Sequence, residues 1–576
     1  MHSTSWKSAG SGSSLLKSLI HYNGRSLMRQ TSEQRVCKQL LEALLFERIE
    51  PFSEHPRQDG NATFRFIRPP YELTINGRRG AFDRIWLELS TGVLTKNNQV
   101  QPMTLAQIIA CFQIKDSLRQ ELEQTVALDE SCPVPIVART QMTYSALEQA
   151  LIEGHPYHPC FKSRIGFSRA DHWRYGPESG QRFRLRFVAL PATTVHMTQM
   201  NGVMEQAFGQ ATLECLNALL IRATNDSADY QIVPVHPWQW RCVGMDVLES
   251  GGIDLGESGP LFQATQSIRT VFQPGVPDAP HIKLPLDLIQ TSARRTFDVP
   301  SIVAAPVLSD WLIRRAEKLP VTLLREFASQ VVETKDGKLS GRIGCLYRDN
   351  VLTNVTAEET VIPFTALALN EANGGLFLDP WFKKYGMEQW VKQFLTVYLQ
   401  PVFRLVAEEG LALEAHAQNS LLVLKDGWPT RLILRDFHDS VEYVGKFVRH
   451  PEEIPDFKTI HPAFNSPVGT YYEMKDVEAL RELVSDTVFV FHLTELSHQL
   501  EDKYGLKETT FFKWAAAVLD RLELSPDRFA ALGFGEATMY TESLFARKFE
   551  TGQCRHLVCN TLYTRTQKGS ETHVIH

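Results

Sequence analysis

The sequence lacks the features that mark secreted, membrane and zinc-ribbon proteins. Its nine cysteines are an odd number and no two are spaced as Cys-x-x-Cys, so neither a disulfide framework nor a zinc ribbon is indicated. No run of about 18 apolar residues occurs, which predicts no membrane-spanning helix and no membrane partner. Segment 1–14 is polar and without the apolar core of a signal peptide, so we expect a disordered tail and a cytoplasmic location.

Common nucleotide-binding motifs and a net positive charge are also missing. Neither GxxxxGK[ST] nor GxGxxG is present, so the common nucleotide-binding folds are not indicated. The net charge of −6 argues against a nucleic-acid partner, and any anion site must therefore be local. The hydrophobic content of 43% is that of an ordinary globular protein, and a chain of 576 residues predicts about three or four domains.

The most informative stretch runs from Ser267 to Thr296 and reads as two β-segments joined by a Pro/Gly turn. Apolar and polar residues alternate from Ile282 to Leu288, which is the pattern of a half-buried strand. Arginine forks match carboxylate and phosphate oxygens, and lysine adds a point charge. We predict a polyanion site here, against the alternative of a surface hairpin with solvated charges. Its donors are Ser267, Arg269, Thr270, Lys283, Thr291, Ser292, Arg294 and Arg295.

A second donor-rich segment is the loop GHPYHPCFKSRIG, residues 154–166. Pro156 and Pro159 are incompatible with a regular helix interior, so the segment is predicted to be a stiffened loop. Because it ends in Lys162 and Arg164, anion binding is favoured over a purely structural role for its histidines.

A third segment, residues 411–440, combines acids, amides and histidines. Two apolar runs flank Asp426-Gly427 and predict a hairpin that brings residues 414–419 close to residues 435–439. Carboxylate and amide oxygens are hard ligands suited to Mg²⁺. The arrangement is analogous to a protein-kinase catalytic loop that is followed by a hairpin and a metal-binding Asp. The chain lacks the kinase Gly-rich loop and the His-Arg-Asp order. The alternative is an ordinary helix and hairpin with satisfied polar residues.

The remaining patterns predict a mixed α+β chain. Strands are expected over 62–90 around a turn at Asn76-Gly77, and a domain boundary is expected near 360–378. Helices are expected over 33–47, 104–128, 304–317, 380–410 and most of 476–548.

Taken in order, these motifs are familiar. The chain resembles the siderophore synthetases that act independently of non-ribosomal peptide synthetases, the aerobactin-synthetase or IucA/IucC type. The resemblance covers nearly the whole chain and rests on GHPYHPCFKSRIGF, SIRT, KLPLDLIQTSARRT and EAHAQNSLLVL followed by RDFHDS. It implies an α+β fold shaped like a cupped hand. Residues 1–135 would form a thumb, residues 136–370 fingers around an antiparallel sheet that binds ATP and carboxylate, and residues 371–576 a mainly helical palm that is catalytic and binds Mg²⁺.

The resemblance also implies a reaction. ATP would adenylate a carboxylate of citrate or a citrate derivative, and an amine or hydroxylamine-bearing nucleophile would then form an amide, with AMP and pyrophosphate released. ATP and Mg²⁺ are the implied cofactors, and a homodimer is expected. Two alternatives stay open: a non-catalytic ATP- or anion-binding protein, and a phosphotransferase that releases ADP.

Roles carried over from the family fall on matching positions. The catalytic residues would be Arg295, His416 and Lys283. The ATP-binding residues would be His158, Lys162, Ser267, Arg269, Thr270, Lys283, Gln418 and Asp436. The substrate carboxylate would be held by His158, Thr291, Ser292, Arg295, His416 and Asn419, and the metal by Glu414 and Asp436.

Overall fold

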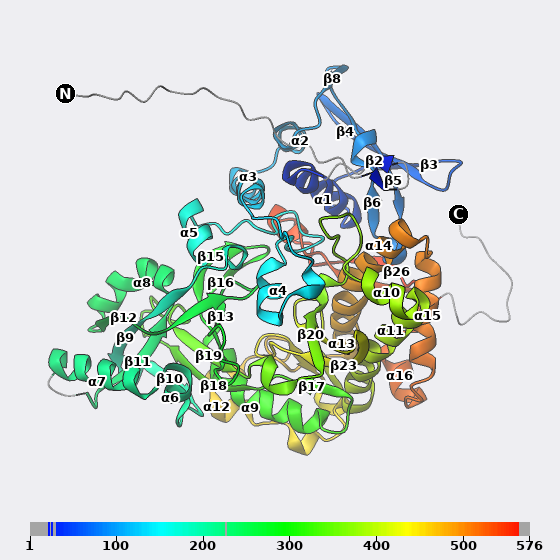
Figure 1. Cartoon of the computed structure of the whole chain (residues 1–576). Coiled ribbons are helices and arrows are strands. Elements are labelled where there is room, and N and C mark those ends of the chain that lie inside the picture. The colour runs from blue at the N-terminus through cyan, green and yellow to red at the C-terminus, as the bar shows by residue number, and fades with distance from the viewer. Residues whose placement is uncertain (1–20, 23–24, 27–29, 225–226, 564–576) are drawn as a thin grey trace, which may run out of the picture.

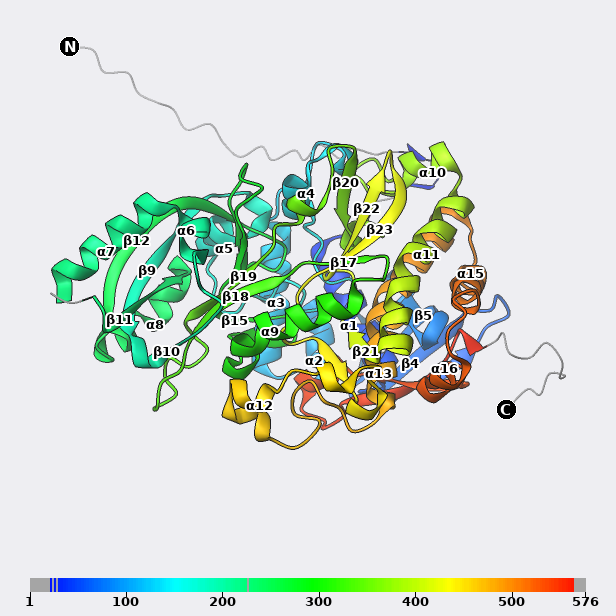
Figure 2. The ribbon, with the colours of Figure 1, turned by 90° about the horizontal axis from the view of Figure 1, so that it is seen from below.

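The structure is a computed structural model that describes residues 21–22, 25–26, 30–224 and 227–563. The tail predicted over 1–14 lies outside these residues. The fold is mixed α+β, as predicted, with an N-terminal sheet and helices, a large central sheet and a mainly helical last third (Figures 1 and 2). None of the described helices is both long and apolar enough to cross a membrane.

The N-terminal part is a small antiparallel sheet packed on helices. The predicted helix over 33–47 is confirmed, and its first turn is capped by the side chain of Thr31. The elements are α1 (Ser32–Phe46), β3 (Ser53–Pro56), β4 (Ala62–Arg68), β5 (Tyr71–Arg79), β6 (Ile85–Leu87), β7 (Val93–Lys96), β8 (Gln99–Gln101), α2 (Leu105–Phe112) and α3 (Asp116–Glu130).

The predicted turn at Asn76-Gly77 is wrong. The β4–β5 hairpin turns at Pro69-Pro70, where Arg68 pairs with Tyr71, and Asn76 pairs with Thr63 inside the ladder. Proline presets the backbone angle that a turn needs, and here two prolines outweigh the Asn-Gly signal. Gly77 serves close packing instead, because a Cβ there would lie 2.6 Å from the carbonyl oxygen of Trp86 on β6.

The central part is built on an eight-stranded antiparallel sheet in the order β10-β18-β19-β14-β13-β12-β9-β11. Figure 1 shows it on the side of the molecule away from the C-terminal helices, with α7 and α8 at its far end. The elements are α4 (Tyr144–Ala150), α5 (Arg169–Tyr175), β9 (Phe183–Pro191), β10 (Val195–Thr198), α6 (Val203–Phe208), α7 (Gln210–Thr224), β11 (Tyr230–Val235), α8 (Pro237–Glu249), β12 (Ile253–Ala264), β13 (Thr270–Phe272), β14 (His281–Lys283), β15 (Leu286–Gln290), β16 (Ala293–Arg295), α9 (Val299–Ala316), β18 (Glu326–Val332) and β19 (Gly344–Arg348).

The single strand predicted from Ile282 to Leu288 is two strands in two sheets. Strand β14 pairs with β13 and β19 in the large sheet, whereas β15 pairs with β16 in a separate hairpin and forms one further bridge, from Ile289 to Ile165. The chain leaves the large sheet at Leu284-Pro285, because proline has no N–H to donate to a ladder. All four apolar residues of the pattern are fully buried, which the alternation indicated correctly.

The last third is mainly helical, and two of its strands, β22 and β23, form a four-stranded sheet with β17 and β20 from earlier in the chain, in the order β17-β23-β22-β20. The hairpin predicted around Asp426-Gly427 is confirmed. The elements are β17 (Val321–Leu323), β20 (Glu359–Pro363), α10 (Asp379–Tyr385), α11 (Met387–Arg404), β21 (Leu411–Leu413), β22 (Ser420–Lys425), β23 (Trp428–Leu434), β24 (Val441–Tyr443), α12 (Phe457–Ile460), α13 (Val477–Val484), α14 (Thr494–Tyr504), α15 (Glu508–Asp520), α16 (Pro526–Leu532), β25 (Thr538–Glu542) and β26 (Arg555–Cys559).

One continuous hydrophobic core joins the N-terminal part to the last third. Side chains from α1, β4 and β5 belong to the same buried cluster as those from α11 and α15. Phe82, for example, stacks on Phe489 with ring centroids 5.8 Å apart. The large sheet has a core of its own between its face and α6 and α7. The two cores leave a polar junction between them, and the candidate site lies there.

Candidate functional site

The junction is closed by Asp436, which follows strand β23 and receives two cations from the large sheet. Lys283, the last residue of β14, donates from Nζ to Asp436 Oδ1 at 3.0 Å. Arg348, the last residue of β19, places Nη1 2.8 Å from Asp436 Oδ2. Burial alone would raise the pKa of Asp436, but the charges of Arg348 and Lys283 hold it well below its ordinary value. Asp436 is therefore an anion held between two cations.

Arg269 and Arg295 add positive charge beside this pair. Arg269 lies in the turn before β13 and donates from Nη1 to the carbonyls of Arg295 and Thr296, both at 3.2 Å. Burial and the neighbouring charge of Arg269 lower the pKa of Arg295 to about 10. Burial also lowers the pKa of Lys283 below its ordinary value. Crowded, desolvated cations are held at a cost in free energy, and a polyanion would relieve it.

His438 completes the polar wall behind Lys283. Its Nδ1 lies 3.1 Å from Glu326 Oε1, its Nε2 lies 3.0 Å from Asp439 Oδ2, and Lys283 Nζ is 3.3 Å from the same Nε2. Burial alone would lower the pKa of His438, but the charges of Asp439 and Glu326 outweigh it and raise the pKa. Lys283 thus faces both the acid and the imidazole of the RDFHDS segment.

The His-Pro loop is ordered by its own histidines. His155 Nδ1 accepts from the backbone N–H groups of Tyr157 and His158 at 3.1 Å, and His158 Nδ1 accepts from Cys160 N–H at 3.1 Å. His158 is only 1% exposed, and its Nε2 has no hydrogen-bond partner among the described residues. Burial and the charges of His155, Lys548 and Arg295 push its pKa well below the ordinary value. A buried, unsatisfied nitrogen beside Arg295 is a candidate contact for a ligand.

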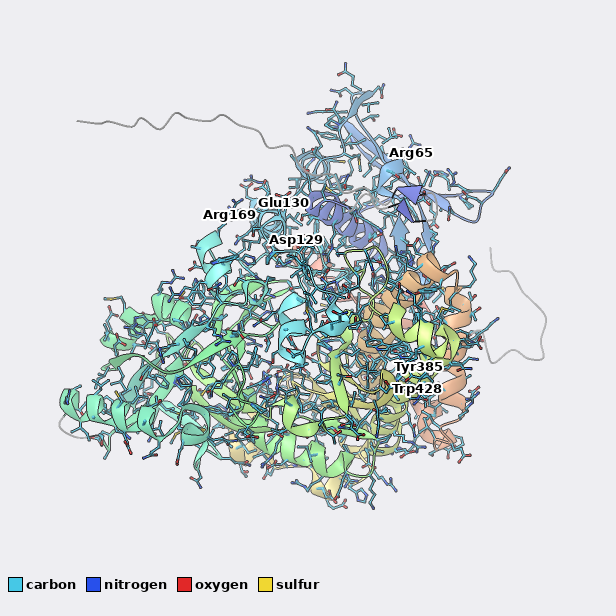
Figure 3. All side chains as sticks on the ribbon, viewed as in Figure 1. Arg65, Asp129, Glu130, Arg169, Tyr385 and Trp428 are labelled. Carbon is cyan, nitrogen blue, oxygen red and sulfur yellow. The ribbon has the colours of Figure 1, made fainter. Side chains whose placement is uncertain are left out.

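The ammonium group of Lys162 is held by hydrogen bonds within the protein. It is 1% exposed, and Nζ donates to Asp129 Oδ1 at 2.7 Å and to the carbonyl of Ile152. Figure 3 labels Asp129 near the end of α3, above the central sheet. Arg164 is likewise held, by two bonds of 2.7 and 3.0 Å to Glu178. The contacts of Lys162 anchor the His-Pro loop to α3. Its predicted role in ATP binding stays a prediction.

The EAHAQNS segment forms a tight loop around His416. The Nδ1 of His416 accepts from the N–H groups of Gln418 and Asn419 at 3.1 and 3.2 Å, which leaves Nε2 facing Glu414 Oε1 at 3.8 Å. Asn419 Nδ2 donates to the carbonyl of Glu414 at 3.1 Å. Burial lowers the pKa of His155 to about 3, and the charges of His416 and Arg295 contribute. Residues from three distant segments therefore act on one another electrostatically.

The tip of the β15–β16 hairpin carries Thr291 and Ser292. Thr291 adopts φ 57°, a left-handed conformation that is unfavourable for a β-branched residue, and Ser292 is exposed. Arg295 Nη2 donates to the carbonyl of Gln290 at 2.9 Å, which braces the hairpin.

Ser267 and Thr270 lie at the start of β13, where the Ser267 Oγ accepts from Thr270 N–H at 3.2 Å. The Thr270 hydroxyl is buried without a partner among the described residues.

Arg348, Glu326 and Glu148 were not predicted from the sequence. Arg348 and Glu326 lie on β19 and β18 in ordinary strand sequence, and nothing local marks them. Strand pairing brings them to the site: β19 pairs with β14, which sets His281 opposite Arg348, and β18 pairs with β19, which sets Glu326 opposite Arg348. That pairing is a property of the folded sheet.

The fit of a divalent metal can be judged from the donors present. Glu326, Asp436 and His438 have ligand atoms within 4.8 Å of one another, and Glu414 is outside that group. Both oxygens of Asp436 are neutralised by cations, and Glu414 is half-buried with His416 as its neighbour. The phosphates of a nucleotide would supply the anions that Lys283 and Arg348 need, and Asp436 would then be free to bind Mg²⁺.

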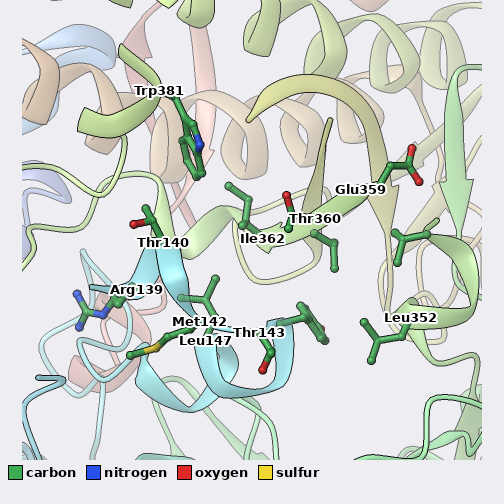
Figure 4. Close-up of a pocket in the computed structure, with 13 residues that line it drawn as sticks. Arg139, Thr140, Met142, Thr143, Leu147, Leu352, Glu359, Thr360, Ile362 and Trp381 are labelled. Carbon is green, nitrogen blue, oxygen red and sulfur yellow. The ribbon is translucent and has the colours of Figure 1, made fainter. Parts of the chain in front are cut away.

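A small pocket of about 130 Å³ lies elsewhere, between α4 and the β17-β23-β22-β20 sheet (Figure 4). Its lining is mostly apolar, including Met142, Leu147, Leu352 and Trp381. None of the predicted site residues lines it, so it is separate from the candidate site.

Comparison with known proteins identifies the family. Residues 143–369 match the model of the IucA / IucC family, and residues 388–566 match that of the Ferric iron reductase FhuF-like transporter. A citryl-spermidine/3,4-dihydroxybenzoyl-citryl-spermidine:spermidine ligase from Bacillus anthracis is 34% identical over 481 residues, 78% of each chain. The chain belongs to the IucA/IucC family.

Other members of the IucA/IucC family cover even more of the chain. A 2-[(L-alanin-3-ylcarbamoyl)methyl]-3-(2-aminoethylcarbamoyl)-2-hydroxypropanoate synthase from Staphylococcus aureus is 28% identical over 559 residues, 89% of each chain. The crystal structure of the petrobactin biosynthesis protein AsbB from Bacillus anthracis has a TM-score of 0.86 at 31% identity, covering 92% of this chain and 95% of that one. The predicted family is confirmed, and by name these relatives are a citryl-spermidine:spermidine ligase, a synthase and a petrobactin biosynthesis protein.

Proposed function

We propose that this protein is an ATP-dependent siderophore synthetase that adenylates a carboxylate of citrate, or of a citrate derivative, and condenses it with an amine. The observation that carries the proposal is the convergence of Lys283 from β14 and Arg348 from β19 on the carboxylate of Asp436, with the charge of Arg269, in the turn before β13, acting on the same carboxylate. Such a group of cations suits the phosphates of ATP, which bring several negative charges at once. It lies beside Arg295 and His158, which suit a carboxylate.

The reaction would proceed in two steps. A carboxylate oxygen attacks the α-phosphorus, a new P–O bond forms, and the bond to pyrophosphate breaks. The amine nitrogen then attacks the acyl carbon, the bond to AMP breaks, and the nitrogen loses a proton. Preorganised cations stabilise the charge that develops at the α-phosphate without having to reorganise.

The predicted residues other than Lys162, which is bound to Asp129 and to the carbonyl of Ile152, have a place in this scheme. Ser267, Arg269, Thr270, Lys283 and Gln418 would hold ATP, and His158, Thr291, Ser292, Arg295, His416 and Asn419 would hold the carboxylate. Glu414 and Asp436 would hold Mg²⁺, which offsets phosphate charge when bound. The thumb, fingers and palm would correspond to residues 1–135, 136–370 and 371–576, with the site between fingers and palm.

The second substrate is expected to be a diamine or polyamine, because one relative is named as a ligase of citryl-spermidine with spermidine and another as the synthase of a product that carries a 2-aminoethylcarbamoyl group. A homodimer in the cytoplasm remains our expectation. Pyrophosphate release measured across a panel of carboxylates, followed by product mass with a panel of amines, tests the proposal. Citrate-dependent AMP and pyrophosphate are expected. ADP as the main product would favour the phosphotransferase alternative, and ATP binding without turnover would favour the binding protein.

The match of residues 388–566 to a ferric-reductase model does not supply a better candidate function. The cysteines described in that range, Cys554 and Cys559, are both exposed and unpaired. The groups of potential metal ligands that involve the same range consist of histidines and carboxylates among the described residues. Iron–sulfur clusters are held by several cysteine thiolates, so an electron-transfer centre is not supported.

A further inference from the structure

Glu148 on α4 is a buried carboxylate that the proposed mechanism does not use. It is 1% exposed, and both of its oxygens are occupied. Oε1 accepts from the Tyr144 hydroxyl at 2.7 Å and from Arg435 Nη1 at 2.8 Å. Oε2 accepts from the backbone N–H and the side-chain Nε2 of Gln266, at 3.2 and 3.0 Å. Four donors from three segments meet on one side chain.

The Gln266 side of this arrangement reaches the predicted ATP-binding turn. Gln266 directly precedes Ser267, and its Oε1 accepts from the Thr365 hydroxyl at 2.9 Å. The turn closes through Thr265 N–H, which donates to the carbonyl of Thr270 at 2.9 Å. Glu148 therefore holds the first residue of the turn that carries Ser267, Arg269 and Thr270.

The Arg435 side reaches the predicted palm loops. Arg435 directly precedes Asp436, its Nε donates to the carbonyl of Gln418 at 3.0 Å, and its backbone N–H donates to the carbonyl of Asn419 at 3.0 Å. Its Nη1 also donates to the Tyr144 hydroxyl at 2.8 Å, which closes a triangle of Tyr144, Glu148 and Arg435. Arg435 thus fixes residues 418–419 and 435–436 relative to Glu148.

A buried ion pair of this kind is weak evidence for stability, since desolvation offsets much of the attraction. The ion pair is better evidence for a fixed geometry, because Glu148 and Arg435 each make several hydrogen bonds that together allow one arrangement of their segments. We infer that Glu148 is a positioning residue that sets the ATP-binding turn and the palm loops in register for attack at the α-phosphate. The inference rests on the proposed function, and it adds three residues, Tyr144, Glu148 and Arg435, to the machinery.

The test compares Glu148→Gln with a matched buried ion pair outside the site. Glu409 is 5% exposed and accepts from Arg315 Nε at 2.9 Å and Nη2 at 2.5 Å, and none of its bonded partners is a predicted site residue. Both substitutions keep the side-chain shape and remove one charge. Both should lower the melting temperature by similar amounts, and assays are run well below either transition.

We expect Glu148→Gln to lower kcat for carboxylate-dependent ATP–pyrophosphate exchange about 100-fold, since misplacement by about 1 Å costs roughly that much. The Kd for ATP should change less than about threefold, and Glu409→Gln should keep near-normal kcat. Tyr144→Phe removes one hydroxyl from the triangle and should fold even if Glu148→Gln does not; we expect a loss of about 3- to 10-fold. Equal kcat values in Glu148→Gln, Tyr144→Phe and Glu409→Gln would overturn the inference.

Hydrogen exchange separates this inference from the proposed function. In Glu148→Gln, peptides that cover 265–270 and 414–420 should both exchange faster, whereas Glu409→Gln should leave both unchanged. If the wild type shows no ATP–pyrophosphate exchange with any carboxylate, the proposed function fails. The hydrogen-exchange rates of the two peptides then still decide whether Glu148 holds the two segments together. Unchanged hydrogen exchange in both peptides of Glu148→Gln would refute this structural link.

Discussion

Single residues in this site are defined by the burial of charge. Arg295 is half-buried, and burial together with the neighbouring charge of Arg269 lowers its pKa to about 10. A guanidinium can grip a carboxylate with two parallel N–H bonds, whereas an ammonium offers only a point charge. Arg295 also donates to the Gln290 carbonyl, which directs its fork. The shape of the group therefore matters as well as its charge.

We predict that Arg295→Lys is not a conservative change. Loss of a charged hydrogen bond in a dry site costs roughly 2–4 kcal/mol, which corresponds to about 30- to 1000-fold in rate. Steady-state pyrophosphate release with citrate measures the effect, and Arg222→Lys, at an exposed arginine on α7, is the control. Near-normal citrate turnover in Arg295→Lys would remove this residue from the site.

Glu442 on β24 is a second residue whose environment sets its charge. Burial, followed by the charges of Glu482, Glu414 and Glu542, raises its pKa from 4.5 to about 7. Its Oε2 is buried without a partner among the described residues. A raised pKa means that the fold binds the proton more tightly than the unfolded chain. Glu442 therefore costs the fold stability as the pH rises from about 4.5 through about 7.

Glu442→Gln should remove that loss. We expect the variant to gain up to roughly 2–3 kcal/mol relative to wild type between pH 5 and pH 8, since one pKa unit is worth about 1.4 kcal/mol. Denaturant unfolding at the two pH values measures it. Glu358→Gln, at an exposed surface pair with Lys425, should show no such pH-dependent gain. Parallel pH profiles for wild type and Glu442→Gln would contradict this account.

At the scale of elements, the β15–β16 hairpin shows a conflict between local conformation and proposed role. Its turn places Thr291, a β-branched residue, at φ 57°. Such a backbone costs on the order of 1–3 kcal/mol and persists where the surroundings, or a function, require it. In the proposed function, the Thr291 hydroxyl contacts the carboxylate, which would explain why glycine is not used.

We predict that Thr291→Gly stabilises the fold and impairs the enzyme. Relief of strain less the added chain entropy of glycine should leave about 1 kcal/mol of stabilisation. Activity should fall severalfold, chiefly through KM for citrate. Gln113→Gly, at φ 51° after α2 and away from the predicted site, should stabilise the protein without loss of activity. Full activity in Thr291→Gly would show that the hydroxyl has no role in binding.

For the molecule as a whole, the site depends on two lobes meeting at Asp436. Lys283 and Arg348 reach it from the large sheet, and Arg435 ties its loop to α4. The lobes differ in what they supply, because the sheet provides cations and the C-terminal part provides carboxylates and His416. Added Mg²⁺ should therefore restore some activity after the loss of a carboxylate, but not after the loss of a cation.

We predict that Asp436→Asn loses activity steeply at low Mg²⁺ and recovers partly as Mg²⁺ rises. Asparagine keeps an oxygen ligand but lacks the charge that attracts the cation. Arg269→Ala should show no such recovery, because its defect is a missing hydrogen-bond donor. A Mg²⁺ titration of pyrophosphate release in wild type and both variants measures this. Identical Mg²⁺ dependence in all three would exclude Asp436 as a metal ligand.

The sequence by itself determined what depends on neighbouring residues along the chain. The capped helix from Ser32 to Phe46, the hairpin at Asp426-Gly427 and the irregular His-Pro loop follow from local periodicity, turn chemistry and proline. The motifs also identified the family. Pro69-Pro70 and Asn76-Gly77 are competing local turn signals. The sequence predicted the wrong turn, because the register of the β4–β5 hairpin is set by the whole ladder.

Only the tertiary structure decided which charged groups meet. Arg435 lies 287 positions from Glu148, and Lys283 lies 153 positions from Asp436, yet each pair is in contact. Lys162 is a free cation in the sequence and a buried partner of Asp129 in the fold. No local pattern specifies such pairs, because they result from strand pairing and from the packing of distant elements. Burial then assigns each group its protonation and decides whether a charge is available to a ligand or held by the protein.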